Sequence, residues 1–149
     1  MKPKFIYAFM KTAEVFSELS HARRLHVGAI IVKNDRIISI GYNGMPAGWD
    51  NNCEYEIIEE VGDDFETILK TRPEVLHAET NAIAKLAKSN ESGDDAIMFI
   101  THAPCLDCAK LIYQSGIRSV FYRDAYRDQS GIQFLEQSKV AVTQVKKDS

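Results

Sequence analysis

The chain has 149 residues, 45% hydrophobic and 26% charged, which predicts one globular domain over residues 1–149. Its net charge of -3 and pI of about 5.8 give no basic surface for a polyanion, so a nucleic-acid substrate is disfavoured. No apolar stretch is long enough to span a bilayer, no signal peptide is recognisable, and three cysteines suggest no disulfide framework, so we expect a cytoplasmic protein without membrane contact.

The first third of the chain predicts a helix followed by a β-hairpin. Apolar residues recur at spacings of three and four over residues 4–20, which indicates a helix with one buried face. Residues 27–32 form a continuous apolar run, typical of a strand buried on both faces. A polar turn at 33–36 leads into a second strand at 37–41.

Residues 41–48 hold three glycines and one proline. Any single glycine here is explained well enough by an ordinary loop. A glycine-rich loop at the end of a strand can also bring backbone N–H groups close to a ligand, which suits a sugar or a phosphate.

Residues 49–75 are the segment whose structure the sequence predicts least clearly. The segment is acidic, and we expect mainly a solvated flap with a short helix at 65–70.

The second half of the chain alternates between helical and strand patterns. Helices are expected at 76–87, 105–115 and 132–137, and strands at 96–101, around 120–122 and at 140–145. Gly116 is well placed to end the second of these helices, and a frayed tail follows the last strand. This order implies an α/β fold with a mixed sheet, in which the first two strands are antiparallel and right-handed crossovers join the later ones.

The residues with metal-binding chemistry lie in two short runs. Cys105 and Cys108 are spaced so that a helix brings both sulfurs to one ion. Pro104 suits the first position of that helix, which would put both cysteines in its first turn, where the helix dipole favours thiolate. A catalytic zinc ion takes three protein ligands plus water, and His77 is the obvious third.

Glu79 stands two residues after His77, and residues two apart lie on nearly opposite sides of a helix. The two side chains can meet one small target only beyond the helix end. We therefore expect His77 to hold the ion and Glu79 to reach the water bound there, as a proton carrier.

Two other interpretations use the same cysteines. They could form a thioredoxin-like redox pair, although such pairs lack the preceding proline and a His-x-Glu partner. They could also belong to a closed structural zinc site, which would need His102 or Cys53 as fourth ligand.

The combination of His77-Ala78-Glu79 with the Pro-Cys-x-x-Cys run at 104–108 resembles the signature of zinc-dependent nucleobase deaminases. The segment 41–48 is similar to the glycine-rich segment of deoxycytidylate (dCMP) deaminases, and the resemblance covers roughly residues 27–126. It implies a three-layer α-β-α cytidine deaminase-like fold with a mixed five-stranded sheet. It also implies one catalytic Zn²⁺ and the hydrolytic deamination of dCMP to dUMP and ammonia, which supplies dUMP for dTTP synthesis.

The resemblance implies further sites. Asn43 would bind the deoxyribose, and Gly41, Tyr42, Asn43 and Gly44 would bind nucleotide effectors, with dCTP and Mg²⁺ activating and dTTP inhibiting a homohexamer. Relatives also have a polar stretch like 123–128, from which Tyr126 or Arg127 could reach the substrate phosphate. A second, structural zinc site is not expected, because 49–75 keeps only Cys53.

The position of Arg24 in the sequence makes it a candidate to bind the substrate phosphate. It precedes the first strand, near where the glycine-rich loop should fold back, and a guanidinium fork suits phosphate. Two alternatives to dCMP deamination stay open: deamination of another base or nucleoside, such as cytidine or a tRNA adenosine, and a zinc-stabilised binding module without turnover.

Overall fold

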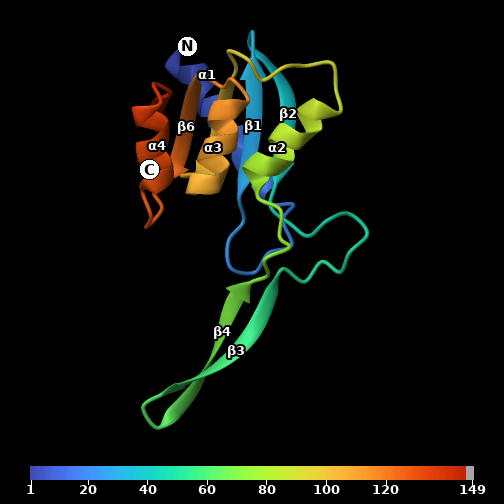
Figure 1. The fold of residues 1–149 in the computed structure, drawn as a ribbon, viewed down its shortest axis with the longest axis vertical. Helices are drawn as coiled ribbons and strands as arrows, with labels where there is room; N and C mark the ends of the chain where they lie inside the picture. The colour runs from blue at the N-terminus through green and yellow to red at the C-terminus, as the bar shows by residue number, and fades with distance from the viewer. Residues whose placement is uncertain (147–149) are drawn as a thin grey trace.

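A mixed five-stranded sheet lies at the centre of the molecule, in the order β2-β1-β5-β6-β7 (Figure 1). The computed structural model describes residues 1–146; the predicted frayed tail at 147–149 lies outside the described residues. The elements are α1 (Pro3–Ser17), β1 (Gly28–Lys33), β2 (Arg36–Tyr42), β3 (Glu54–Val61), β4 (Asp64–Thr71), α2 (Ala78–Ala87), β5 (Ile97–His102), α3 (Leu106–Gln114), β6 (Ser119–Asp124), α4 (Ser130–Gln137) and β7 (Ala141–Gln144).

Helices cover both faces of this sheet, so the fold has three layers. Side chains alternate along β1: Ala29 and Ile31 pack with α2, α3 and α4, whereas Ile30 and Val32 pack with α1 on the opposite face. All four are buried, as the continuous apolar run predicts. Burial of each large aliphatic side chain contributes about 1.5–3 kcal/mol to folding.

The pairing of the strands confirms the predicted mixed sheet. β1 pairs antiparallel with β2 and with β5, and β6 lies parallel to both β5 and β7. Antiparallel neighbours can be joined by a tight turn, whereas each parallel pair here is joined through a helix, α3 or α4. Gly116 follows α3 with a φ of +85°, the left-handed conformation expected of a glycine that ends a helix.

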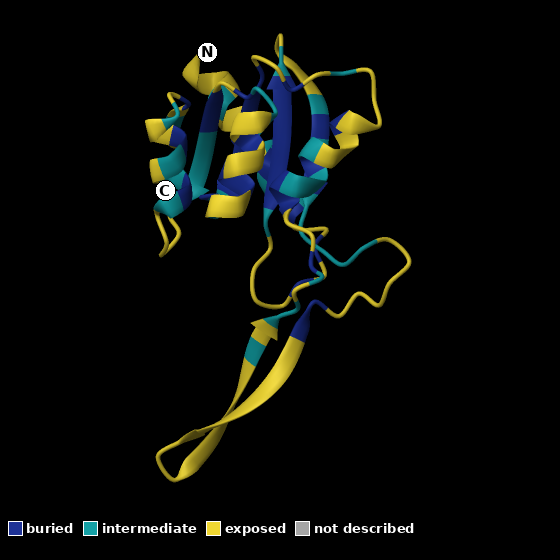
Figure 2. Ribbon diagram, viewed as in Figure 1, coloured by how far each residue is buried: buried dark blue, intermediate teal, exposed yellow. Residues whose placement is uncertain are grey.

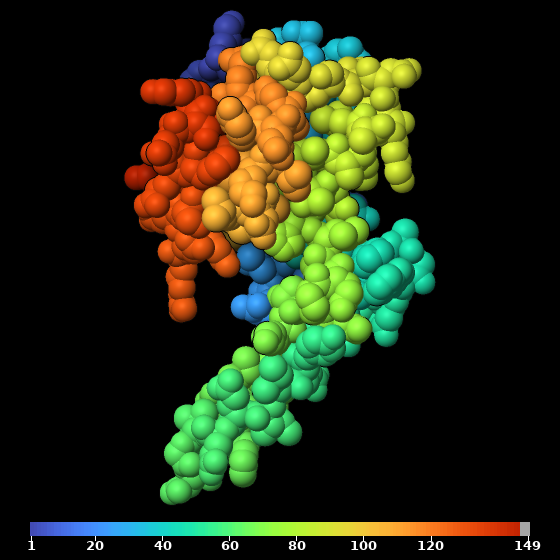
Figure 3. Space-filling view, in the orientation of Figure 1, coloured from blue at the N-terminus to red at the C-terminus, as the bar shows by residue number. Residues whose placement is uncertain are grey.

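The prediction of a short helix at 65–70 is wrong. Residues 54–71 form an antiparallel hairpin, β3 and β4, which we call the arm; it projects from the body (Figures 1 and 3). The turn residue Gly62 has a φ of +63°, which a two-residue hairpin turn requires and glycine adopts readily. The predicted exposure of this segment is confirmed, because nearly the whole arm is exposed (Figure 2).

Within residues 1–146, none of the helices combines the length and the apolar character needed to cross a membrane.

Candidate active site

Two helix N-termini meet at one edge of the sheet and bring the predicted metal ligands together. His77 is the N-cap residue of α2 and Cys105 is the N-cap residue of α3, both with extended backbone. The Nδ1 atom of His77 lies 3.3 Å from the Sγ of Cys108 and 3.7 Å from the Sγ of Cys105. The three ligand atoms all lie within 4.8 Å of one another.

These distances fit a tetrahedral zinc ion. Zn–S bonds of about 2.3 Å and Zn–N bonds of about 2.0 Å put a ligand nitrogen and a ligand sulfur about 3.5 Å apart. The two observed N–S distances, 3.3 and 3.7 Å, lie on either side of this value. A set of one imidazole and two thiols suits zinc, and three ligands leave the fourth position of a catalytic site open.

One detail of the prediction needs correction. Pro104 is not the first residue of α3, because Cys105 is the N-cap and α3 begins at Leu106. Only Cys108 therefore lies within the first turn, while the extended backbone of Cys105 points its sulfur back toward His77.

Neither candidate for a fourth ligand belongs to the group of ligand atoms found in residues 1–146, which comprises His77, Cys105 and Cys108. The ring of His102 is held elsewhere: Nδ1 lies 2.9 Å from Thr101 Oγ1 and Nε2 lies 3.4 Å from Asp124 Oδ2. Cys53 is buried in a small cluster with Ala22 and Val75. The arrangement favours an open, catalytic type of site over a closed structural one.

Glu79 lies in the first turn of α2 and is 5% exposed. Burial, the main cause, raises the pKa of its carboxyl group above the usual value. A carboxyl group with a raised pKa can both accept and donate a proton near neutral pH. His77 stands just outside the helix and Glu79 just inside it, and both residues line the same cavity.

The two thiols differ in their ionisation. Hydrogen bonds from Cys108 and His77 lower the pKa of Cys105. The pKa of Cys108 is raised, because Cys108 shares a hydrogen bond with Cys105 and is buried. Thr80 Oγ1 lies 3.7 Å from the Sγ of Cys108, and a thiolate at that position can only accept a hydrogen bond from the hydroxyl.

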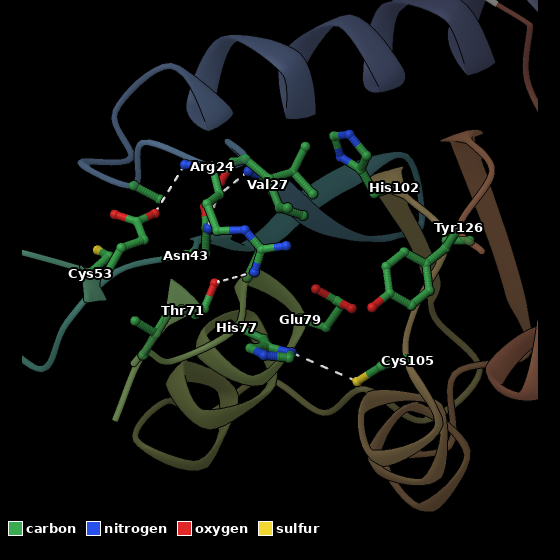
Figure 4. A pocket seen from close by; sticks show the side chains of 16 residues that line it. Arg24, Val27, Asn43, Cys53, Thr71, His77, Glu79, His102, Cys105 and Tyr126 are labelled. Atoms are coloured by element: carbon green, nitrogen blue, oxygen red, sulfur yellow. Dashed lines mark hydrogen bonds between the residues drawn. The ribbon is translucent and has the colours of Figure 1, made fainter. Parts of the chain in front are cut away.

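A cavity of about 450 Å³ opens in front of these groups. Arg24, Asn43 and Tyr126 lie on its wall together with His77 and Glu79 (Figure 4). Its volume is in the range of small-molecule sites, which are about 300–1,000 Å³. The cavity can therefore hold a ligand of nucleotide size against the metal ligands.

Arg24 reaches this cavity in a defined position. Its Nη1 donates a 3.0 Å hydrogen bond to Thr71 Oγ1, and its backbone N–H donates a 3.0 Å bond to Glu54 Oε2 (Figure 4). The sequence does not predict these two partners, because they belong to the segment interpreted as a flap.

Asn43 has a structural task as well as a place on the cavity wall. Its Oδ1 accepts a 2.9 Å hydrogen bond from the Val27 backbone and its Nδ2 donates a 2.8 Å bond to the Leu25 carbonyl. The side chain therefore fixes the segment that follows Arg24. One amide hydrogen of Nδ2 remains for a ligand.

The other predicted binding residues lie outside the residues that line the cavity: Arg127, Gly41, Tyr42 and Gly44. Arg127 is exposed beyond Tyr126. Gly41 has a packing role, because a Cβ atom there would collide with the Ala78 carbonyl oxygen of α2. Gly44 pairs with Leu76 through backbone hydrogen bonds of 3.1 and 2.8 Å.

Comparison with known proteins agrees with this geometry. Residues 3–124 match the family model for the cytidine and deoxycytidylate deaminase zinc-binding region. The chain is 37% identical to ComE operon protein 2 of Bacillus subtilis over 94% of its own length and 70% of that protein. It is 34% identical to the deoxycytidylate deaminase of Enterobacteria phage T4 over 78% of this chain and 76% of the phage protein.

A solved structure extends this similarity to the whole fold. The dCMP deaminase of cyanophage S-TIM5, in complex with dCMP and dUMP, superposes with a TM-score of 0.86 at 46% identity, covering 97% of this chain and 99% of that one. The family match spans both halves of the metal-binding group and the buried Glu79. The chain therefore belongs to the family of zinc-dependent cytidine and deoxycytidylate deaminases.

Proposed function

We propose that residues 1–149 form a single deaminase domain that hydrolyses dCMP to dUMP and ammonia, supplying dUMP for dTTP synthesis. The observation that carries this proposal is the composition of the cavity. Arg24, which suits a phosphate, lines the same cavity as the buried carboxyl group of Glu79, next to a set of ligands suited to zinc. The cyanophage relative, whose structure contains dCMP and dUMP, supports the same substrate.

His77, Cys105 and Cys108 would hold the zinc ion, which when bound supplies a water molecule acidic enough to lose a proton near neutral pH. Glu79 would take that proton and pass it to N3 of the cytosine ring while C4 gains the hydroxyl group. It would then take the proton of the hydroxyl group now bonded to C4 and pass it to the amino group, so that the C4–N bond breaks and ammonia leaves. Burial of Glu79 keeps bulk water from competing for these protons.

Arg24 binds the 5′-phosphate in this proposal, and Tyr126 lies on the wall of the same cavity. Asn43 contacts the deoxyribose through its remaining amide hydrogen. Arg127 is not assigned to the phosphate, because it does not line the cavity.

The resemblance extends the proposal to regulation. Residues 41–44 bind dCTP with Mg²⁺ as activator, or dTTP as inhibitor, in a cytoplasmic homohexamer. Assembly is supported by the large apolar side chains that the arm exposes, above all Ile58 and Phe65, each 71% exposed. Three free cysteines support a reducing compartment.

The test is the ultraviolet loss of the cytosine chromophore on zinc-loaded protein, with dCMP, deoxycytidine and CMP in parallel, each with and without dCTP. Turnover of dCMP in preference to the other two supports the substrate, and its increase with dCTP supports the regulation. Equal turnover of deoxycytidine contradicts the phosphate site. Zinc content without deamination of any nucleotide or nucleoside identifies a binding module instead.

A further inference from the structure

Arg24 lies in residues 18–27, which connect α1 to β1 without helix or strand. It is exposed, so packing around its own segment does not fix its side chain. A free arginine samples many rotamers, and ordering it on a ligand costs conformational entropy. A phosphate site built on Arg24 therefore needs a second element to hold the guanidinium in place.

The base of the arm supplies that element. Glu54 and Thr71 are directly opposed as the first residue pair of β3 and β4, and we call them the basal pair. Glu54 Oε2 accepts the backbone N–H groups of Arg23 at 2.9 Å and Arg24 at 3.0 Å. Thr71 Oγ1 accepts from Arg24 Nη1 at 3.0 Å. One member of the basal pair holds the backbone and the other holds the guanidinium.

Glu54 is itself fixed firmly. Its side chain is 1% exposed, and Arg23 Nε lies 3.5 Å from its Oε1. Arg23 also donates hydrogen bonds of 3.1 Å to Glu56 Oε1 and to Asn52 Oδ1. The carboxylate is therefore both buried and ion-paired, which makes it a rigid anchor for the segment that carries Arg24.

The hydrogen bond to Thr71 uses one of the five N–H donors of the Arg24 guanidinium. No other hydrogen bond of that guanidinium is formed within residues 1–146 of this structure. Its remaining donors stay available on the cavity wall that also holds Tyr126 and Glu79 (Figure 4). A guanidinium group that is held at one nitrogen, with the N–H donors of the other nitrogens unused, is pre-organised to bind an anion.

We propose that Glu54 and Thr71, the basal pair of the arm, are positioning residues that give this site its preference for a phosphorylated substrate. This inference rests on the proposed function and deepens it. The basal pair does not touch the reacting atoms. It holds the Arg24 guanidinium in position, so that the arm becomes part of the substrate site.

The experiment compares kcat and KM for dCMP and deoxycytidine on zinc-loaded protein carrying Thr71→Val. This change keeps the shape of the side chain and removes the acceptor for Arg24. We expect KM for dCMP to rise about ten-fold, the effect of losing one hydrogen bond to a charged group, with kcat little changed. The constants for deoxycytidine stay the same, and Thr71→Ser restores the wild-type KM. Thr67→Val, at an exposed position of β4 away from the basal pair, has no effect.

A double-mutant cycle sharpens the result. If Thr71 acts through Arg24, Thr71→Val adds nothing to the defect of Arg24→Ala, because the two changes remove one interaction. A wild-type preference for dCMP that survives Thr71→Val intact overturns the inference and leaves the proposed function standing. Equal losses for dCMP and deoxycytidine, or additive losses in the double variant, overturn it as well. A wild type that shows no preference for dCMP overturns the proposed substrate and, with it, the role of the basal pair.

Discussion

At the scale of single residues, Glu79 is the side chain on which the chemistry depends most. Replacing it with glutamine keeps the shape of the side chain and removes its ability to carry a proton. We expect Glu79→Gln to lower kcat by about 10²–10⁴-fold, the usual range for a lost general acid or base. Zinc content, measured by atomic absorption, should stay at one ion per chain.

Cys105→Ala is the matched comparison for this change, since it should remove zinc as well as activity. A zinc-loaded Glu79→Gln protein with appreciable turnover would show that another group moves the protons.

Thr80 supports a second prediction at this scale. Its hydroxyl lies 3.7 Å from the Sγ of Cys108 and stabilises the thiolate form that binds metal. Loss of such an outer contact weakens metal binding about 10–100-fold. We expect Thr80→Val to bind zinc more weakly by this order in competition with a chromophoric chelator, while Thr80→Ser retains wild-type affinity. Unchanged affinity in Thr80→Val would leave the hydroxyl without a role at the metal.

The residues of the site differ in how far sequence predicts them. His77, Cys105 and Cys108 are predictable because spacing within two short runs reflects the geometry of helix ends. Glu54 and Thr71 are not, because they meet Arg24 only through the pairing of two strands that lie 30 and 47 residues further along the chain. No local pattern carries that contact.

At the scale of elements, the position of α2 decides the position of both His77 and Glu79. Gly41 allows this helix to approach β2, since a Cβ atom at that position would collide with backbone atoms of Ala78 and Ala82. We expect Gly41→Ala to lower the free energy of unfolding by about 1–3 kcal/mol, as overpacking does, with a fall in melting temperature. Gly44→Ala is the control, because nothing lies within 4 Å of the added methyl group. A melting temperature of Gly41→Ala equal to that of Gly44→Ala would contradict the packing role.

Most elements of the body follow from periodicity, whereas the arm does not. The apolar residues of β1 and β5 are predictable as buried strands because both faces of the central sheet are covered. β3 and β4 are covered on neither face, so they show no clean alternation of apolar and polar residues. The signal that remains is Gly62-Asp63 between two β-branched and aromatic runs, which is typical of a tight hairpin.

At the scale of the whole molecule, the contacts within a single chain do not explain how the arm is stabilised. A two-stranded hairpin alone is at best marginally stable in water. β3 and β4 contact each other extensively, and neither strand contacts another helix or strand extensively. The arm holds seven of the chain's 21 acidic residues and one of its 18 basic residues, so the remainder of the chain is net basic. Opposite charges on arm and body favour contact between copies of the chain.

If the chain assembles as proposed above, we expect the assembly to depend on the arm. Replacing Ile58 and Phe65 with serine removes its two most exposed apolar side chains and leaves the body untouched. We expect this double variant to sediment as a smaller species than the wild type in analytical ultracentrifugation, with an unchanged melting temperature of the body. Added salt should weaken wild-type assembly too, because it screens the attraction between exposed charges. Thr67→Ser, on the same face of the arm as Ile58, should assemble normally. Wild-type sedimentation of the Ile58→Ser/Phe65→Ser protein would show that copies of the chain meet through another surface.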